Sequence, residues 1–406
     1  MTKHDYALSE ASGMSSSLVK PAANGRGLSV FVLIDALGWK YLEGREFLSD
    51  LLPCRRPLRT VLGFSSGAIP SILTGQLPSK HGHWNLFYYD PKGSPFQWIR
   101  YLRFLPNLIL DSRIFRKLVK ELGRHFLGMG PQFECCVSPR FMPYFNWLEK
   151  RNIYDRGGIM GAPSIFDQLS ESGIAHRVYT YHEATDAEIL RRAESDLRAG
   201  QASFFFLYLS EMDMFLHVKC NEPKKIEERL EWYEKGLRRV FKAAREADPR
   251  ATLVITSDHG MTPVHHHYDV AKEIENLALR IPEDYLVVYD STMARFWFFN
   301  EEARQKVLQT LQRLPCGRVL SDRELLELGV LFEDRRYGEV IFLLHPGWMI
   351  SQSDFNGPGW MPAGMHGYDP ADAHSDAVFL SNWLPVFPVQ AVQDIYRCMS
   401  EATLGR

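Results

Sequence analysis

Carboxylate and imidazole side chains follow three strongly apolar segments of the chain. Asp35 ends the first segment. Asp213 follows the second, with His217 four residues later, and the third ends in the pair Asp258 and His259. One acidic residue after a strand is commonly a helix cap, but three such ends, two of them with His, favour a metal site. Mixed Asp and His ligands suit Zn²⁺ first, with Mn²⁺ or another divalent ion as the alternative.

A second candidate for chemistry is the pair Ser65 and Ser66, which opens a short apolar segment that ends at Gly75. The segment predicts a helix with Pro70 in its first turn. A serine at a helix N-terminus lies where backbone N–H groups and the helix dipole favour negative charge. An isolated pattern of this kind is usually an N-cap serine. Next to candidate metal ligands, the interpretation as a simple N-cap is less favoured.

Strands and helices that alternate along the chain must position these residues. Continuous apolar runs are typical of strands covered on both faces. They occur at residues 28–34, 178–181, 204–209, 253–256, 294–299 and 340–344. Helical patterns occur at residues 163–172, at 189–197 after a capping box of Thr185 and Glu188, and along 226–244. The alternation predicts an α/β fold with a mainly parallel central sheet flanked by helices, in which ligands bind at the carboxyl edge.

The domain organisation follows from where this alternation starts and stops. Residues 1–26 are polar and are expected to be a flexible N-terminal arm, and residues 27–406 a single catalytic domain. Two stretches, at about 84–160 and 265–365, break the alternation, and we interpret both as cap insertions over one edge of the sheet. The first holds seven basic and two acidic residues between Arg100 and Arg124. That stretch is either a solvated helix face or a lid that attracts an anionic or lipid-linked substrate.

Other histidines are interpreted as supporting residues. His81 and His83 flank Gly82 and are expected on a surface turn, in structural roles. The run of three histidines at residues 265–267 is expected to be a loop at the mouth of the cleft.

Composition excludes several classes of protein. Lys and Arg number 47 against 49 Asp and Glu, a formal net charge of −2, so no basic excess points to a nucleic-acid polymer. Six cysteines without a C-x-x-C pair argue against a zinc ribbon or a disulfide scaffold. No segment has the pattern of a signal peptide or a transmembrane helix. We therefore expect a cytoplasmic protein, with peripheral membrane contact as a further expectation. The sequence does not indicate an oligomeric state.

Five motifs, taken in order, resemble the alkaline phosphatase superfamily, and the branch they resemble most is the nucleotide pyrophosphatase or type I phosphodiesterase family. They are Leu33–Gly38, Ser65–Gly82, Glu211–His217, Ser257–Met261 and Gly364–Asp369. The resemblance runs from about Leu28 to Phe379, nearly the whole chain.

The resemblance implies a two-metal site with a serine nucleophile. Asp213, His217 and His366 would hold one ion. Asp35, Asp258 and His259 would hold the other. Ser65 would be the nucleophile and a further ligand of the second ion, with Ser66 as the alternative.

The reaction implied by the resemblance is hydrolysis of a phosphodiester or pyrophosphate bond through a phosphorylated serine, on a nucleotide- or lipid-linked phosphate ester. A phosphomonoesterase on the same site and a transferase that passes the phosphoryl-linked group to an alcohol are the alternatives. One position departs from the family pattern as we interpret it. Ala68 stands three residues after Ser65, where the resemblance leads us to expect an Asn that donates to a phosphoryl oxygen. Either Ser66, a backbone N–H or another residue is the donor, or the substrate differs.

Overall fold

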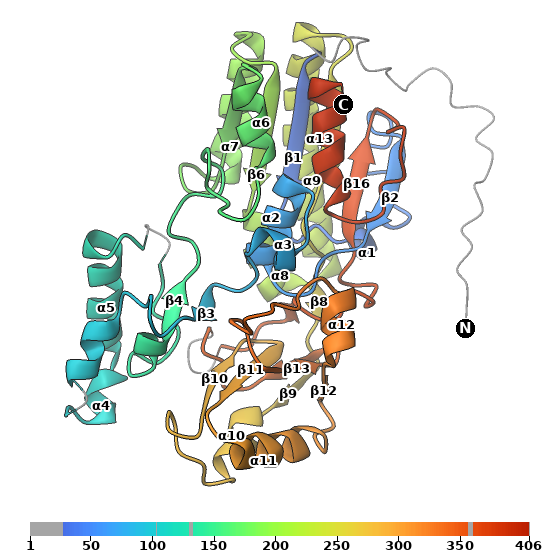
Figure 1. Ribbon diagram of the computed structural model, residues 1–406. Coiled ribbons are helices and arrows are strands. Elements are labelled where there is room, and N and C mark those ends of the chain that lie inside the picture. Colours follow the sequence, from blue (N-terminus) through green and yellow to red (C-terminus); the bar gives the residue numbers. More distant parts are fainter. Residues whose placement is uncertain (1–26, 103, 130–132, 356–359, 406) are drawn as a thin grey trace.

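The computed structural model describes residues 27–102, 104–129, 133–355 and 360–405, so the expected N-terminal arm lies outside the described residues (Figure 1). Its centre is a six-stranded sheet in the order β2-β16-β7-β1-β6-β5. These strands are β1 (Ser29–Ile34), β2 (Cys54–Leu58), β5 (His176–Tyr179), β6 (Phe204–Leu209), β7 (Thr252–Thr256) and β16 (Ala377–Ser381). Strands β7, β1, β6 and β5 are parallel, and β16 and β2 add an antiparallel edge. The prediction of an α/β fold with a mainly parallel sheet flanked by helices is confirmed.

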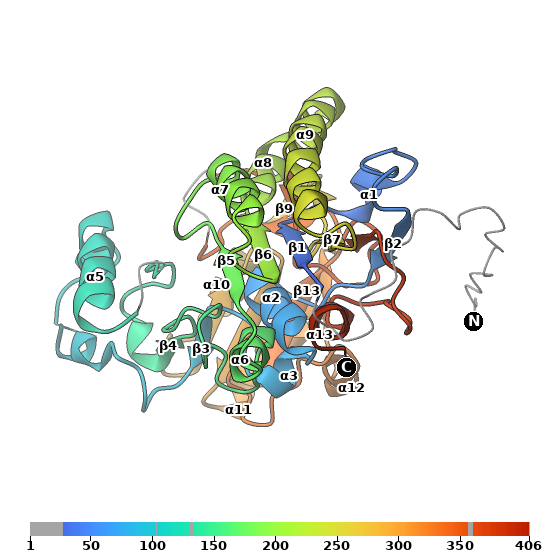
Figure 2. The same cartoon turned by 90° about the horizontal axis from the view of Figure 1, so that it is seen from above.

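Helices cover both faces of this sheet (Figure 2). They are α2 (Ser65–Thr74), α6 (Ile165–Glu171), α7 (Asp186–Arg198), α8 (Glu211–Lys219), α9 (Pro223–Ala247) and α13 (Asp394–Leu404), with the shorter α1 (Trp39–Leu42) and α3 (Pro78–His81). On β1, Val30 and Val32 pack into a core with α7, α8 and α9. Phe31 and Leu33 pack into a second core with α2, α6 and α13. Because both faces of β1 are buried, its sequence does not alternate between apolar and polar residues.

The predicted elements appear with small shifts. Strand β6 has the predicted bounds, whereas β5 begins at His176, two residues before the predicted start. Helix α7 begins at Asp186, where the Thr185 hydroxyl accepts the N–H of Glu188. Helix α2 begins at Ser65, so Pro70 lies in its second turn rather than its first.

Residues 265–365 build a second, four-stranded antiparallel sheet in the order β10-β11-β13-β12. Its elements are β10 (Tyr285–Tyr289), β11 (Met293–Phe298), β12 (Gly317–Val319), β13 (Val340–Leu344), α10 (Val270–Glu275), α11 (Glu301–Leu311) and α12 (Asp322–Glu327). The apolar runs at 294–299 and 340–344 therefore do not belong to the central sheet. On β11, Ala294 and Phe296 face the α10–α11 side, and Met293 and Trp297 pack on the other side. An antiparallel strand that is buried on both faces therefore has the same continuous apolar sequence as a buried parallel strand.

The histidine run at residues 265–267 is not the loop that we expected. His266 begins β9 (His266–Tyr268), which pairs with β14 (Trp348–Ile350). The His266 ring packs on Trp348 with the ring centres 4.5 Å apart. Pairing with β14 and this ring contact hold the segment extended. A further short pair, β8 (Thr262–Pro263) and β15 (Gly364–Met365), lies next to the candidate site.

The other insertion forms a lobe that projects to one side of the molecule (Figures 1 and 2). At its base β3 (Phe87–Tyr89) pairs with β4 (Phe145–Trp147). Between these strands lie the 3₁₀ turns η1 (Gln97–Leu102) and η2 (Met142–Tyr144) and the helices α4 (Asn107–Leu110) and α5 (Arg113–Phe126). Aromatic side chains of the lobe, among them Phe96, Phe133 and Trp147, form a core that continues into β10 and β11 through Leu286 and Trp297. We call residues 86–147 the insertion lobe.

Candidate metal centre

The carboxyl edge of the parallel strands brings the predicted ligands together. Asp35 follows β1 directly, and its N–H donates to the Leu209 carbonyl of β6 at 2.9 Å. Asp258 and His259 follow β7 across the same edge. Helix α8 begins two residues after β6 and carries Asp213 and His217 on one face, one turn apart. His366 follows β15 directly.

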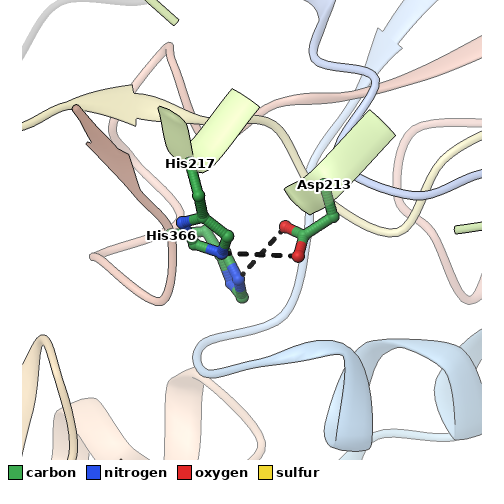
Figure 3. Close-up of side chains that lie close together, drawn as sticks. All are labelled: Asp213, His217 and His366. Carbon is green, nitrogen blue, oxygen red and sulfur yellow. Dashed lines mark ion pairs between the residues drawn. The ribbon is translucent and has the colours of Figure 1, made fainter. Parts of the chain in front are cut away.

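The first group consists of Asp213, His217 and His366 (Figure 3). His217 Nε2 lies 3.3 Å from Asp213 Oδ2, and His366 Nε2 lies 3.5 Å from Asp213 Oδ1. His217 Nδ1 lies 2.8 Å from the carbonyl oxygen of Gly364. This contact fixes the ring so that Nε2 faces the other two residues, as the second nitrogen of a metal-binding histidine usually does.

The second group is centred on His259. Its Nε2 lies 3.3 Å from Asp258 Oδ2 and 3.5 Å from Asp35 Oδ1. Its Nδ1 lies 2.9 Å from the Gly260 carbonyl oxygen, which again turns Nε2 toward the carboxylates. Ligand atoms of Asp35, Asp213 and His259 all lie within 4.8 Å of one another. The rings of His259 and His366 stack with centres 3.9 Å apart, so the two groups are adjacent and Asp213 belongs to both.

The donor set fits divalent cations. Four buried atoms in the two groups have no hydrogen-bond partner among the described residues: Asp35 Oδ1, Asp213 Oδ1, Asp258 Oδ2 and His366 Nδ1. Burial, and then repulsion by Asp258 and Asp213, raises the pKa of Asp35 well above its usual value. Burial lowers the pKa of His366 far below its usual value, which keeps the ring neutral. Crowded carboxylates with unpartnered oxygens and neutral imidazoles are what metal binding requires.

The Ser65 hydroxyl contacts this centre, as does that of Tyr208, which donates to Asp35 Oδ2. Ser65 is the first residue of α2, and its Oγ lies 3.1 Å from His259 Nε2. Ser66 is engaged differently, because its Oγ donates to the Trp84 carbonyl at 2.6 Å. The geometry therefore favours Ser65 over Ser66 as the reactive hydroxyl.

A cavity of about 710 Å³ opens over Ser65, Asp213 and His217. Most of its other lining residues are apolar and come from several segments: Phe64, Leu86, Trp147, Tyr181, Met214, Phe355, Trp360 and Met365. The cavity is thus walled by the insertion lobe as well as by the sheet edge. A smaller cavity of about 220 Å³ adjoins Ser65 and Ser66 and includes Lys150 and Arg151.

Two polar residues of the cavity were missed in the sequence. Asn85 is only 1% exposed, lines the large cavity, and its Oδ1 has no hydrogen-bond partner among the described residues. Glu149 lines both cavities, and burial raises its pKa to about 7. Ala68, where we expected a phosphate donor, is buried in the core beneath α2. Asn85 lines the cavity, and its Nδ2, which donates to the weak acceptor Met293 Sδ at 3.9 Å, is the better candidate for the donor.

The expectation that His81 and His83 lie on a surface turn was wrong, because both are buried. His81 Nε2 lies 2.9 Å from the Ser71 hydroxyl of α2, and His81 Nδ1 accepts the N–H of His83 at 3.1 Å. Burial lowers the pKa of His81 to about 3 and that of His83 to about 4. These histidines tie α2 to the turn after α3.

Known structures share this architecture at low sequence identity. Human ectonucleotide pyrophosphatase/phosphodiesterase 5 is 16% identical, with a TM-score of 0.66 over 92% of this chain and 94% of its own. An inactive threonine-to-alanine variant of the murine protein, in complex with AMP, is 18% identical, with a TM-score of 0.64 over 93% and 95%. Phosphonoacetate hydrolase of Sinorhizobium meliloti, in complex with phosphonoformate, is 15% identical, with a TM-score of 0.65 over 96% and 100%. No curated protein sequence matches the chain.

These solved structures share the fold of the chain, a central sheet flanked by helices. The family model described as type I phosphodiesterase / nucleotide pyrophosphatase matches residues 29–369. The chain belongs to this family, and the predicted enzyme class, a phosphoric ester hydrolase, is confirmed.

Proposed function

We propose that this enzyme cleaves phosphodiester or pyrophosphate bonds with two divalent cations, Zn²⁺ in the first instance, and with Ser65 as the nucleophile. The observation that carries the proposal is the pair of adjacent ligand groups with the Ser65 hydroxyl 3.1 Å from His259. Asp213, His217 and His366 would hold one cation. Asp35, Asp258 and His259, with Ser65, would hold the other. Bound cations would neutralise phosphoryl charge and lower the pKa of a coordinated hydroxyl.

The residues of the chain supply the covalent step. Ser65, having lost its proton to solvent, attacks phosphorus through Oγ while the bond from phosphorus to the leaving oxygen breaks, and the leaving oxygen takes a proton from water. Water then adds to phosphorus, the bond to Oγ breaks, and a proton returns to Ser65. The N-terminus of α2 favours the negative charge that collects at this point. Asn85 would donate its amide N–H to a phosphoryl oxygen.

The lining of the large cavity favours a diester over a monoester. None of its described lining residues is Lys or Arg, and a monoester dianion usually needs such a cation for its third oxygen. A diester carries one charge less and replaces that oxygen with a substituent, for which Trp147, Leu86 and Trp360 supply apolar walls. The murine relative in complex with AMP supports a nucleotide-linked phosphate as one substrate class.

The alternative of a phosphomonoesterase rests on a specific observation. Lys150 and Arg151 line the smaller cavity next to Ser65, and a phosphate turned that way would meet their charges. Transfer of the phosphoryl-linked group to an alcohol would use the same serine and remains the second alternative.

The deciding experiment compares kcat/KM for bis-p-nitrophenyl phosphate and p-nitrophenyl phosphate, with the same metal loading. We expect the diester to be preferred, because the large apolar cavity accepts the second aryl group. A matched variant, Lys150→Gln with Arg151→Gln, should leave diester turnover nearly unchanged. A preference for the monoester that this double variant abolishes would establish the phosphatase alternative instead.

A further inference from the structure

The insertion lobe exposes large apolar side chains to solvent. Of the 17 large hydrophobic residues that are exposed in the described part of the chain, seven lie between residues 101 and 126. They are Tyr101, Phe104, Leu108, Ile109, Ile114, Leu118 and Phe126. We call these seven residues the apolar face. Such a concentration on one projecting lobe marks an interaction surface rather than scattered exposure.

Helix α5 shows how the apolar face is built. One side of α5, with Phe115, Val119 and Gly123, is buried in the core of the lobe. Ile114 and Leu118, four residues apart, lie on another side and are 83% and 49% exposed. Neither Ile114 nor Leu118 belongs to the hydrophobic core that the described residues of the lobe form, as expected for an apolar pair on a side of the helix away from its buried side.

Two basic residues flank this apolar pair. Arg113 and Lys117 are exposed, again four residues apart, and neither forms an ion pair with any residue that the structure describes. The other basic residues of α5 are engaged: Lys120 and Arg124 pair with Glu134, and Arg116 donates to backbone carbonyls. Arg113 and Lys117 are therefore available to a partner.

The lobe also differs in charge from the molecule as a whole. Residues 100–124 hold seven basic and two acidic side chains, whereas the whole chain has a formal charge of −2. The partner of this surface must accept apolar side chains and positive charge together. A second copy of the chain, docked face to face by a twofold axis, would oppose its own positive charges. A bilayer that contains anionic lipids satisfies both requirements.

We propose that the apolar face docks on an anionic lipid bilayer, with its side chains inserted among the headgroups and with Arg113 and Lys117 at the level of the lipid phosphates. Contact would be interfacial, since none of the described helices combines the length and apolarity needed to cross a bilayer. The same lobe supplies Leu86 and Trp147, at and next to its base strands, to the cavity wall. A docked lobe would thus tether the catalytic cavity to the membrane surface.

The experiment is co-sedimentation of the whole protein with vesicles of phosphatidylcholine, alone and mixed with phosphatidylglycerol. We expect binding to the mixed vesicles, weakened by salt. The double variant Arg113→Gln with Lys117→Gln should bind them about 30-fold more weakly. Ile114→Ser with Leu118→Ser should lose about tenfold or more.

Matched controls carry the same changes elsewhere on the surface. Lys224→Gln with Arg250→Gln removes two exposed charges, and Leu326→Ser with Val386→Ser removes two apolar side chains that are 67% and 84% exposed. Both controls should bind vesicles as the parent does, and all four variants should keep parent turnover of a small aryl ester. Equal binding to neutral and mixed vesicles, or undiminished binding by the lobe variants, would overturn the proposal. The parent could instead form dimers and fail to bind vesicles. If Ile114→Ser with Leu118→Ser dissociated those dimers, the surface would be assigned to a second copy of the chain.

Discussion

At the scale of single residues, the site separates one reactive hydroxyl from its neighbour. Ser65 Oγ contacts His259, whereas Ser66 Oγ is held by a backbone carbonyl. We expect Ser65→Ala to lower kcat by about 10⁴-fold or more, as loss of a nucleophile does, with the fold and metal content intact. Ser66→Ala is the control and should keep most activity. Mass spectrometry of the enzyme quenched during turnover should find the phosphate on Ser65; a phosphate on Ser66 would move the nucleophile one residue along.

Asn85 provides a second test at this scale. An amide that donates to the charge developing on a phosphoryl oxygen acts chiefly in the transition state. We expect Asn85→Ala to lower kcat by about 10²- to 10³-fold and to change KM little. Asn276→Ala, at an exposed helix end, is the control. If KM rises while kcat stays at the parent value, Asn85 binds the ground state only.

Some residues of the site could be predicted from the sequence and others could not, and the difference has a physical reason. Asp35, Asp258 and His259 each follow a strand, and parallel strands end at one edge, so their convergence was predictable. Asn85 was not, because a single amide in the apolar stretch between Trp84 and Leu86 has the same pattern as a hydrogen-bonded core residue. Only the structure shows that Asn85 lines the cavity beside Ser65 and that its Oδ1 has no hydrogen-bond partner among the described residues.

At the scale of elements, the apolar runs predicted where strands lie in the sequence but not which sheet each strand joins. Strands β1 and β11 are both buried on two faces, so a continuous apolar run could not tell a parallel strand from an antiparallel one. The antiparallel edge strand β2 was missed, because its sequence Cys54–Leu58 contains two arginines and a proline. The predicted helix bounds were close to the observed ones, because capping residues such as Thr185 can be recognised in the local sequence.

The junction of α2 and α3 gives a prediction for stability. Burial depresses the pKa of His81 and His83, so below about pH 6.5 the unfolded chain binds protons that the folded chain does not. Stability is therefore full above pH 6.5 and falls as the pH drops toward 4, with a slope of up to ~2.7 kcal/mol per pH unit for two protons. His83→Leu should remove about half of that slope in urea titrations of the metal-free protein.

The control for this experiment is His374→Leu, which changes an exposed histidine. It should leave the pH dependence of unfolding as it is in the parent. An unchanged slope in His83→Leu would mean that the folded and unfolded chains take up the proton of this ring over the same pH range, so that burial does not lower its pKa.

At the scale of the whole molecule, metal binding should hold the sheet edge together. The ligands come from β1, β7, α8 and the segment after β15, and their carboxylates repel one another without a cation. We expect two ions per chain by elemental analysis, about 4 Å apart as in two-metal hydrolases. Chelation should lower the free energy of unfolding, by ~2.7 kcal/mol for each site that was held at 100 times its metal Kd.

Two variants sharpen this prediction. Asp213→Asn alters the residue shared by both groups and should reduce the content of both ions. Asp369→Asn lies in the same motif as His366 but pairs with Arg318, so it should keep two ions. One ion, or none, at saturating zinc would rule out the two-metal reaction.

The insertion lobe has a consequence for how such an enzyme can change over time. The candidate metal ligands come from the sheet edge and the segment after β15, whereas Leu86 and Trp147, which wall the cavity, belong to the insertion lobe. Substitutions in the lobe can reshape the space for the leaving group without disturbing the ligands. Chemistry and selectivity are therefore inherited as separable modules, and substrate preference can drift within a lineage while the reaction is preserved.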